Sequence, residues 1–148
     1  MEETPRHSRR AVIVFVNDFD LSAAAALRYA RSLRPSTLRA VHFVIDGQQA
    51  QRLRAAWPPE HSVPLELVDC PDRRLTWCAA DLARHEAELP GTQVTVILSG
   101  RSASPLLGRL WHGRTADKIA AAVSRVPNVA VTVIPPLWVA SEPSRSGR

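Results

Sequence analysis

The stretch Val94-Thr95-Val96-Ile97-Leu98-Ser99-Gly100 decides the fold, because it reads as a buried strand that stops at a glycine. A long segment follows, and a regular amphipathic pattern resumes after Gly113, at Thr115-Ala116-Asp117-Lys118-Ile119. A strand that leads through a loop to a helix N-terminus gathers free backbone N–H groups and partial positive charge at one point. The stretch therefore predicts a loop that faces an anion such as phosphate.

Strand patterns and helix patterns alternate along the whole chain. The run 11–16 is continuously apolar and ends in Asn17-Asp18, as expected of a strand buried on both faces. Further strands are expected at 38–45, 65–68 and 129–134. Helical spacing fills the intervals, with Asp20 as the expected cap of the first helix and Pro71 in the first turn of the third. Side chains expected on the buried face of the third helix are Leu75, Cys78, Ala79, Leu82 and Leu89.

This alternation predicts an α/β fold with a single five-stranded parallel sheet, doubly wound, in the order 3-2-1-4-5. Ligands of such sheets bind beyond the carboxyl ends of the strands, where the winding reverses. In this order the reversal lies beside the first strand. Asn17-Asp18 and Ser99-Gly100 are therefore expected to meet in one crevice.

The 148 residues suffice for one domain, expected at 11–135 between a disordered basic tail at 1–10 and a C-terminal tail at 136–148. The formal net charge is +5, and Lys118 is the single lysine among 19 cations. Because the arginines are spread along helices without interleaved aromatic residues, we expect no nucleic-acid partner. The sequence has neither an apolar run of membrane-spanning length nor a signal peptide pattern, which predicts a cytoplasmic protein.

Cysteine and histidine positions do not suggest a metal site. Cys70 and Cys78 are too few and wrongly spaced for zinc, and His42 and His61 have no partner at a metal-binding offset. A disulfide is not expected in the cytoplasm, so Cys78 is predicted to be a buried free thiol on its helix. We also expect no enzymatic activity, since no Walker-type lysine or GxSxG nucleophile motif is present.

Residues 11–135 resemble the universal stress protein family, which has a Rossmann-like fold of the adenine nucleotide alpha hydrolase-like type. That family holds ATP with a strand-one Asp and a pattern G-x2-G-x9-G-[ST]. Gly100 and Gly113 match the outer glycines, whereas the middle glycine falls on Ala103. The resemblance implies ATP or another adenine nucleotide as ligand. The nucleotide-binding residues that follow from it are Asn17, Asp18, Gly100, Arg101, Ala103, Gly113, Arg114 and Thr115.

These matches include departures with physical consequences. Asn17 takes the position of the strand-one Asp, with Asp18 adjacent, and Arg114 takes the position of the final Ser or Thr. Alanine permits the close backbone approach of glycine poorly. Arg114 offers a bidentate phosphate contact in place of the hydroxyl, or marks a site that keeps only the fold.

The chain is also similar, and more specifically so, to the cytoplasmic C-terminal domain of bacterial amino acid permeases of the amino acid–polyamine–organocation class. The similar segments are 69–75, 105–110 and 114–120. This resemblance implies a non-enzymatic regulatory domain of an amino acid permease, at the cytoplasmic face of the inner membrane. Its partner would be a membrane transporter domain, in the same or another chain.

Three alternatives remain open at this stage. The first is a universal-stress-fold scaffold or dimerisation module with a degenerate nucleotide site, because Val129–Ile134 is expected at a sheet edge where a homodimer can form. The second is a phosphoacceptor receiver domain, which Asn17-Asp18 and Asp69 partly fit although 134–136 offers no lysine. The third is an enzyme acting on nucleotides.

Overall fold

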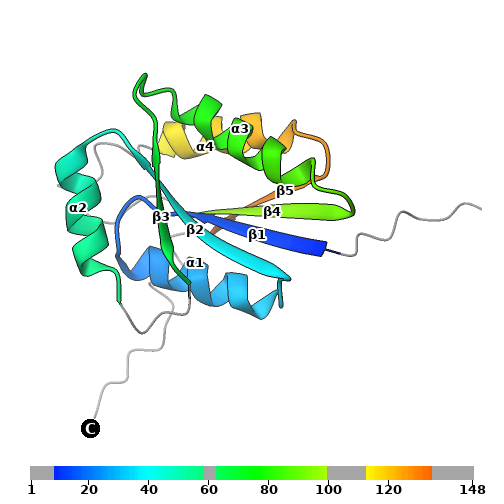
Figure 1. Cartoon of the computed structure of the whole chain (residues 1–148), viewed down its shortest axis with the longest axis horizontal. Helices are drawn as coiled ribbons and strands as arrows, with labels where there is room; N and C mark the ends of the chain where they lie inside the picture. Colours follow the sequence, from blue (N-terminus) through cyan, green and yellow to red (C-terminus); the bar gives the residue numbers. More distant parts are fainter. Residues whose placement is uncertain (1–8, 59–62, 100–112, 135–148) are drawn as a thin grey trace, which may run out of the picture.

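The computed structural model describes residues 9–58, 63–99 and 113–134, and residues 113–115 by their backbone alone. Five parallel strands form one sheet in the order β3-β2-β1-β4-β5, which confirms the predicted fold class and order (Figure 1). The strands are β1 (Arg9–Phe15), β2 (Thr37–Val44), β3 (Leu65–Asp69), β4 (Thr92–Ser99) and β5 (Val129–Ile134).

Helices cover both faces of this sheet (Figure 1). Buried side chains of α1 and α2 pack on the face that carries Val12 and Val14, and those of α3 and α4 pack on the face that carries Ile13 and Phe15. The helices are α1 (Leu21–Ser32), α2 (Gly47–Ala56), α3 (Leu75–Ala87) and α4 (Gly113–Ser124).

The continuous apolar run of β1 explains its central place. Residues 11–16 are fully buried, and alternate side chains enter the two cores on opposite faces. β1 begins at Arg9, two residues before the predicted start, because Arg9 and Arg10 continue the pairing with Thr92 and Gln93 of β4. The strand therefore reaches into the segment expected to be a tail.

Side-chain caps begin the first two helices. The Asp20 carboxylate accepts the N–H of Ala23 and caps α1 as predicted, and Asp46 caps α2 by accepting the N–H of Gln48. The prediction for α3 is wrong at both ends. α3 begins at Leu75 rather than Pro71, because residues 70–74 form a turn in which Arg73 has a φ of 58°. Leu89 lies beyond the last turn and is 44% exposed.

The two edges of the sheet are β3 and β5. The edge position of β5 is as predicted, and its Val133 is 43% exposed. Dimerisation through this strand stays a prediction. Among the described residues, every helix falls short of the length and apolar character needed to cross a bilayer.

Candidate functional site

The carboxyl ends of β1 and β4 lie side by side. The two strands pair in parallel with Phe15 opposite Leu98, so Asn17-Asp18 and Ser99 follow at the same edge. α4 leads from the carboxyl edge of β4 back to the start of β5, and this crossover places its N-terminus at the same edge. The predicted meeting of these two strand ends is confirmed at the level of the backbone.

Asn17 and Asp18 have local partners in this turn. The side-chain amide of Gln49, from α2, donates to the Asn17 side-chain oxygen at 3.3 Å and to its backbone oxygen at 3.4 Å. The Asp18 carboxylate accepts the N–H of Phe19 at 2.8 Å. Gln49 was not among the predicted residues, since nothing in the sequence ties the start of α2 to the end of β1.

His42 is the second residue that sequence reasoning missed. It lies in β2, is 3% exposed, and its Nδ1 is 2.8 Å from the carbonyl oxygen of Val16. Because a carbonyl only accepts, Nδ1 carries the proton of the neutral ring and Nε2 offers a lone pair. Nε2 is buried and has no hydrogen-bond partner among the described residues. The sequence feature that could have pointed to this residue is a histidine placed within an apolar strand.

Burial lowers the pKa of His42, whereas the hydrogen bond to Val16 and the charge of Asp18 act in the opposite direction. The lowered pKa means that the unfolded chain binds more protons than the folded one as pH falls below about 6.5. The contribution of His42 to stability is therefore complete above that pH and is lost on acidification.

We expect His42→Gln to flatten the loss of stability between about pH 6.5 and pH 5, because glutamine does not titrate and most carboxylates are still ionised there. Urea unfolding of both proteins across this range measures the difference. The other four histidines are present in both proteins, so the difference between the profiles isolates position 42. Parallel pH profiles would contradict the assignment of a neutral buried His42.

The other predicted site residues are described in part or not at all. Gly113, Arg114 and Thr115 form the first turn of α4 by their backbone. Gly100, Arg101 and Ala103 lie outside the described residues. The roles of all six stay predictions.

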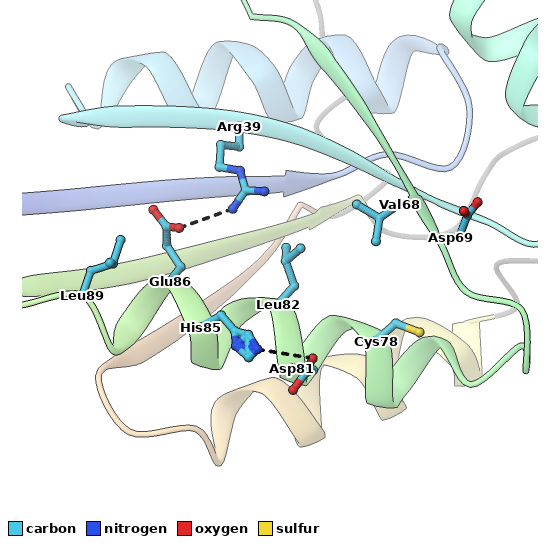
Figure 2. A pocket seen from close by; sticks show the side chains of 9 residues that line it. All are labelled: Arg39, Val68, Asp69, Cys78, Asp81, Leu82, His85, Glu86 and Leu89. Atoms are coloured by element: carbon cyan, nitrogen blue, oxygen red, sulfur yellow. Dashed lines mark hydrogen bonds and ion pairs between the residues drawn. The ribbon is translucent and has the colours of Figure 1, made fainter.

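A second feature is a cleft of about 440 Å³ on the α3 face of the sheet (Figure 2). It lies between α3 and the strands β2 and β3. In it Arg39 points toward Glu86, and His85 lies 3.8 Å from Asp81 on the surface of α3. The cleft is lined by Arg39, Val68, Asp69, Cys78, Asp81, Leu82, His85, Glu86 and Leu89.

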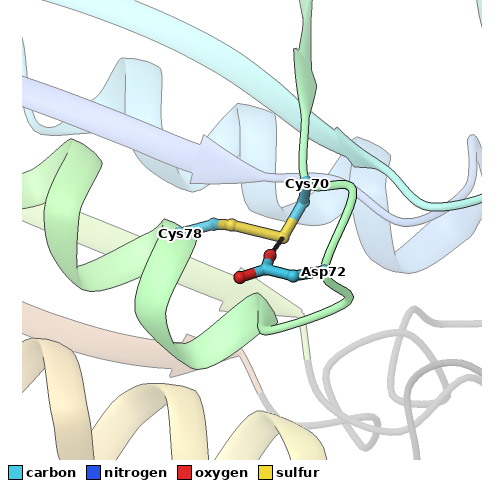
Figure 3. Close-up of side chains that lie close together, drawn as sticks. All are labelled: Cys70, Asp72 and Cys78. Carbon is cyan, nitrogen blue, oxygen red and sulfur yellow. Dashed lines mark hydrogen bonds between the residues drawn. A yellow bond between two sulfur atoms is a disulfide. The ribbon is translucent and has the colours of Figure 1, made fainter.

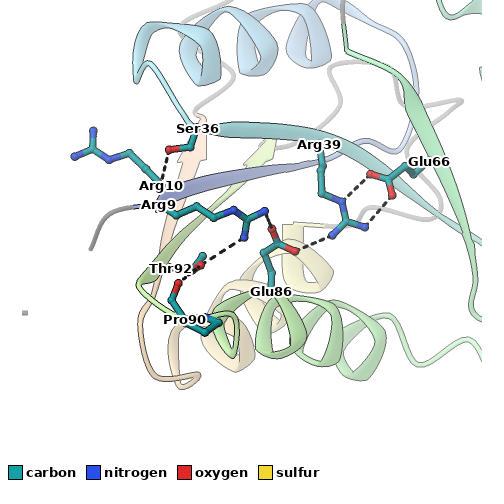
Figure 4. Close-up of polar contacts among 8 residues, drawn as sticks. All are labelled: Arg9, Arg10, Ser36, Arg39, Glu66, Glu86, Pro90 and Thr92. Atoms are coloured by element: carbon teal, nitrogen blue, oxygen red, sulfur yellow. Dashed lines mark hydrogen bonds and ion pairs between the residues drawn. The ribbon is translucent and has the colours of Figure 1, made fainter. Parts of the chain in front are cut away.

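A chain of ion pairs runs through Arg39 and Glu86, two of the residues that line this cleft (Figure 4). Glu86 of α3 lies between two arginines, 3.0 Å from Arg9 and 3.3 Å from Arg39. Arg39 also makes a bidentate contact with Glu66 of β3, at 2.7 and 2.8 Å. The hydrogen bond with Glu66 raises the pKa of Arg39 above its ordinary value, so Arg39 stays charged. The network joins β1, β2, β3 and α3.

The prediction of free thiols is wrong, because Cys70 and Cys78 form a disulfide (Figure 3). The turn before α3 returns the helix to the end of β3 and brings the two Cα atoms to 6.4 Å. With Asp72 they form a cluster whose ligand atoms lie within 4.8 Å of one another. Both sulfurs are used in the bond, so neither offers a thiolate to a metal in this state.

No curated protein matches this chain. A family model described as the KimA potassium transporter C-terminal domain matches residues 6–136, which include all nine helices and strands described above. The match supports the transporter C-terminal part of our expectation. The universal stress protein, nucleotide and amino acid parts stay predictions. The chain belongs to the KimA potassium transporter C-terminal domain family.

Proposed function

We propose that this chain is a non-enzymatic regulatory domain of a membrane transporter. In this proposal it binds an adenine nucleotide at the carboxyl edge of β1 and β4, on the cytoplasmic side of the membrane. The family match supports the transporter, and the parallel sheet supports the position of the site. Potassium, which the family description names, replaces the amino acid as the proposed cargo.

One observation carries the nucleotide part. The buried Nε2 of His42 offers a lone pair with no partner among the described residues, and Nδ1 of the same ring lies 2.8 Å from the carbonyl oxygen of Val16, the residue directly before Asn17. An unpaired buried acceptor is costly, so a ligand that donates to it gains binding free energy. A nucleotide combines the required parts: phosphates for the helix N-terminus and an amino or hydroxyl donor for the imidazole.

The neighbouring side chains suit such a ligand. Asn17 is held by Gln49, and Asp18 is held against the N–H of Phe19, so both stand in a turn that is already ordered. Binding to a preformed turn avoids part of the entropic cost of ordering it. Asp18 is also placed to accept a ribose hydroxyl or to coordinate a nucleotide-bound Mg²⁺.

We expect calorimetric titration of the purified chain with ATP, AMP and cyclic dinucleotides to give heat with at least one of them. Gly113→Asp should weaken that binding by about tenfold or more, because it puts a negative charge where the phosphates approach the N-terminus of α4. Ala121→Asp is the matched control, since Ala121 is exposed on the same helix but far along it.

The outcomes separate the proposals. If the wild type gives no binding heat with any nucleotide of the panel, nucleotide sensing is rejected. If both variants lose the same amount of affinity, the role of Gly113 is rejected. Turnover of the nucleotide would reject a non-enzymatic role.

A scaffold or dimerisation module is the second candidate, favoured by the exposed edge strand β5 with Val133 on its surface. Sedimentation equilibrium tests the dimerisation, and a monomer at high concentration would exclude dimerisation through β5.

A further inference from the structure

The Cys70–Cys78 bridge ties two elements that are otherwise weakly joined. Cys70 directly follows the edge strand β3 and continues its pairing, since its N–H donates to the Val44 carbonyl at 3.1 Å. Cys78 lies in the first turns of α3, eight residues later. The bridge therefore fixes the turn 71–74, which leads from the sheet to the helix.

The two sulfurs differ in how they can be reached. Cys70 is fully buried and does not line the cleft. Cys78 is half-buried and lines the cleft together with Asp81 and Leu82. A small molecule that enters the cleft therefore meets Cys78 and not Cys70.

We propose that this bridge is a reversible thiol–disulfide exchange site for low-molecular-weight thiols, with Cys78 as the attacked sulfur. A thiolate attacks Sγ of Cys78, the bond to Cys70 breaks, and Cys70 leaves as a thiolate that takes up a proton. A second thiol then attacks the sulfur of the attached molecule and releases Cys78. Two thiols are oxidised to one small disulfide, and two electrons reduce the bridge.

The turn 71–74 depends on the bridge. Residues 71–74 are exposed, and Arg73 holds a left-handed φ of 58° that costs a non-glycine residue free energy. Within the described residues no side chain caps α3, because Arg74 at the cap position makes no such hydrogen bond. Breaking the bridge therefore releases this turn and frees the start of α3 from the end of β3.

Asp72 tunes the exchange. Its Oδ1 lies 4.0 Å from Sγ of Cys70, where a negative charge opposes the thiolate that forms as Cys70 leaves. Asp72→Asn should speed reduction by about threefold. Asp46→Asn is the matched control, because asparagine caps α2 as well as aspartate does and Asp46 lies in a different turn.

The test uses the full chain without denaturant. The oxidised protein is incubated with glutathione, quenched with acid, alkylated and digested with trypsin, which cleaves after Arg73 and Arg74 and so separates the two cysteines. We expect glutathione on the Cys78 peptide during the reaction and two alkylated thiols at its end. Glutathione on the Cys70 peptide, or a bridge that is reduced only after unfolding, would overturn the proposal.

Hydrogen exchange gives a second readout. The amides of Arg73 and Cys78, which donate to the carbonyls of Cys70 and Arg74 at 3.1 and 3.0 Å, should exchange at least about tenfold faster after reduction, while those of β1 keep their rates. The double variant Cys70→Ser/Cys78→Ser should show the fast exchange without any thiol. Equal rates in oxidised and reduced wild type would overturn the role of the bridge, whether or not the double variant folds. The inference does not depend on nucleotide binding.

Discussion

Phe15→Ala is expected to lower the free energy of unfolding by about 4 kcal/mol. Phe15 lies at the end of β1, is 1% exposed, and packs edge-to-face on Phe43 with ring centroids 5.1 Å apart. Alanine would leave a cavity between the sheet and α3, and the neighbouring side chains can fill it only in part. Urea unfolding followed by circular dichroism measures the change.

Two other substitutions should cost less than Phe15→Ala and serve as its controls. Phe15→Leu keeps most of the volume and should cost about 1.5 kcal/mol. Leu89→Ala removes a side chain that is 44% exposed and should change stability by less than about 0.5 kcal/mol. A loss below about 1.5 kcal/mol for Phe15→Ala would show that this part of the core is not packed as described.

Glu86→Ala is the second large effect that we expect, with a loss of about 2 kcal/mol. Removing the carboxylate leaves Arg9 and Arg39 close to each other, with 32% and 29% of their side chains exposed. Solvent screens part of this repulsion, so the loss is smaller than for a fully buried pair. Thermal unfolding should shift down by about 6 °C.

Asp81→Ala is the control for Glu86→Ala. Asp81 sits on the same helix and pairs with Arg84 at 3.4 Å, but both side chains are 50% exposed. Such a pair contributes less than about 0.5 kcal/mol. Equal losses of stability in the two variants would show that the ion pairs of Glu86 stabilise the fold no more than a surface ion pair does.

The central place of β1 and the start of α1 could be predicted because their signals are local, and the strand order followed as the commonest one for such a sheet. The unbroken apolar run of β1 requires burial on both faces, and only a central strand of a doubly wound sheet provides it. The cap at Asp20 is likewise contained within four residues. Signals of this kind need no knowledge of distant contacts.

The start of α3 could not be predicted, since two readings of the same residues compete. Pro71 and Asp72 favour the first turn of a helix, yet the chain needs those positions to turn from β3. The bridge between Cys70 and Cys78 depends on that turn. Sequence spacing alone does not show which requirement wins.

The candidate site was predicted only where it follows a strand end. Asn17 and Asp18 were found because they end an apolar run. Gln49 and His42 were missed, because the hydrogen bonds that place them join residues 32 and 26 positions apart. The same holds for Glu86, whose partners Arg9 and Arg39 come from two different strands.

The ion-pair network lies where β1, β2 and β3 begin, at the opposite edge of the sheet from the turns that follow those strands (Figure 4). Because the two features lie at opposite ends of the strands, substitutions in the turns need not disturb the ion pairs. The turns that follow the strands can change in sequence to bind new ligands, while the ion-pair network at the starts of the strands maintains the fold. Homologues should therefore differ most in the turn 17–20 and least around Glu86.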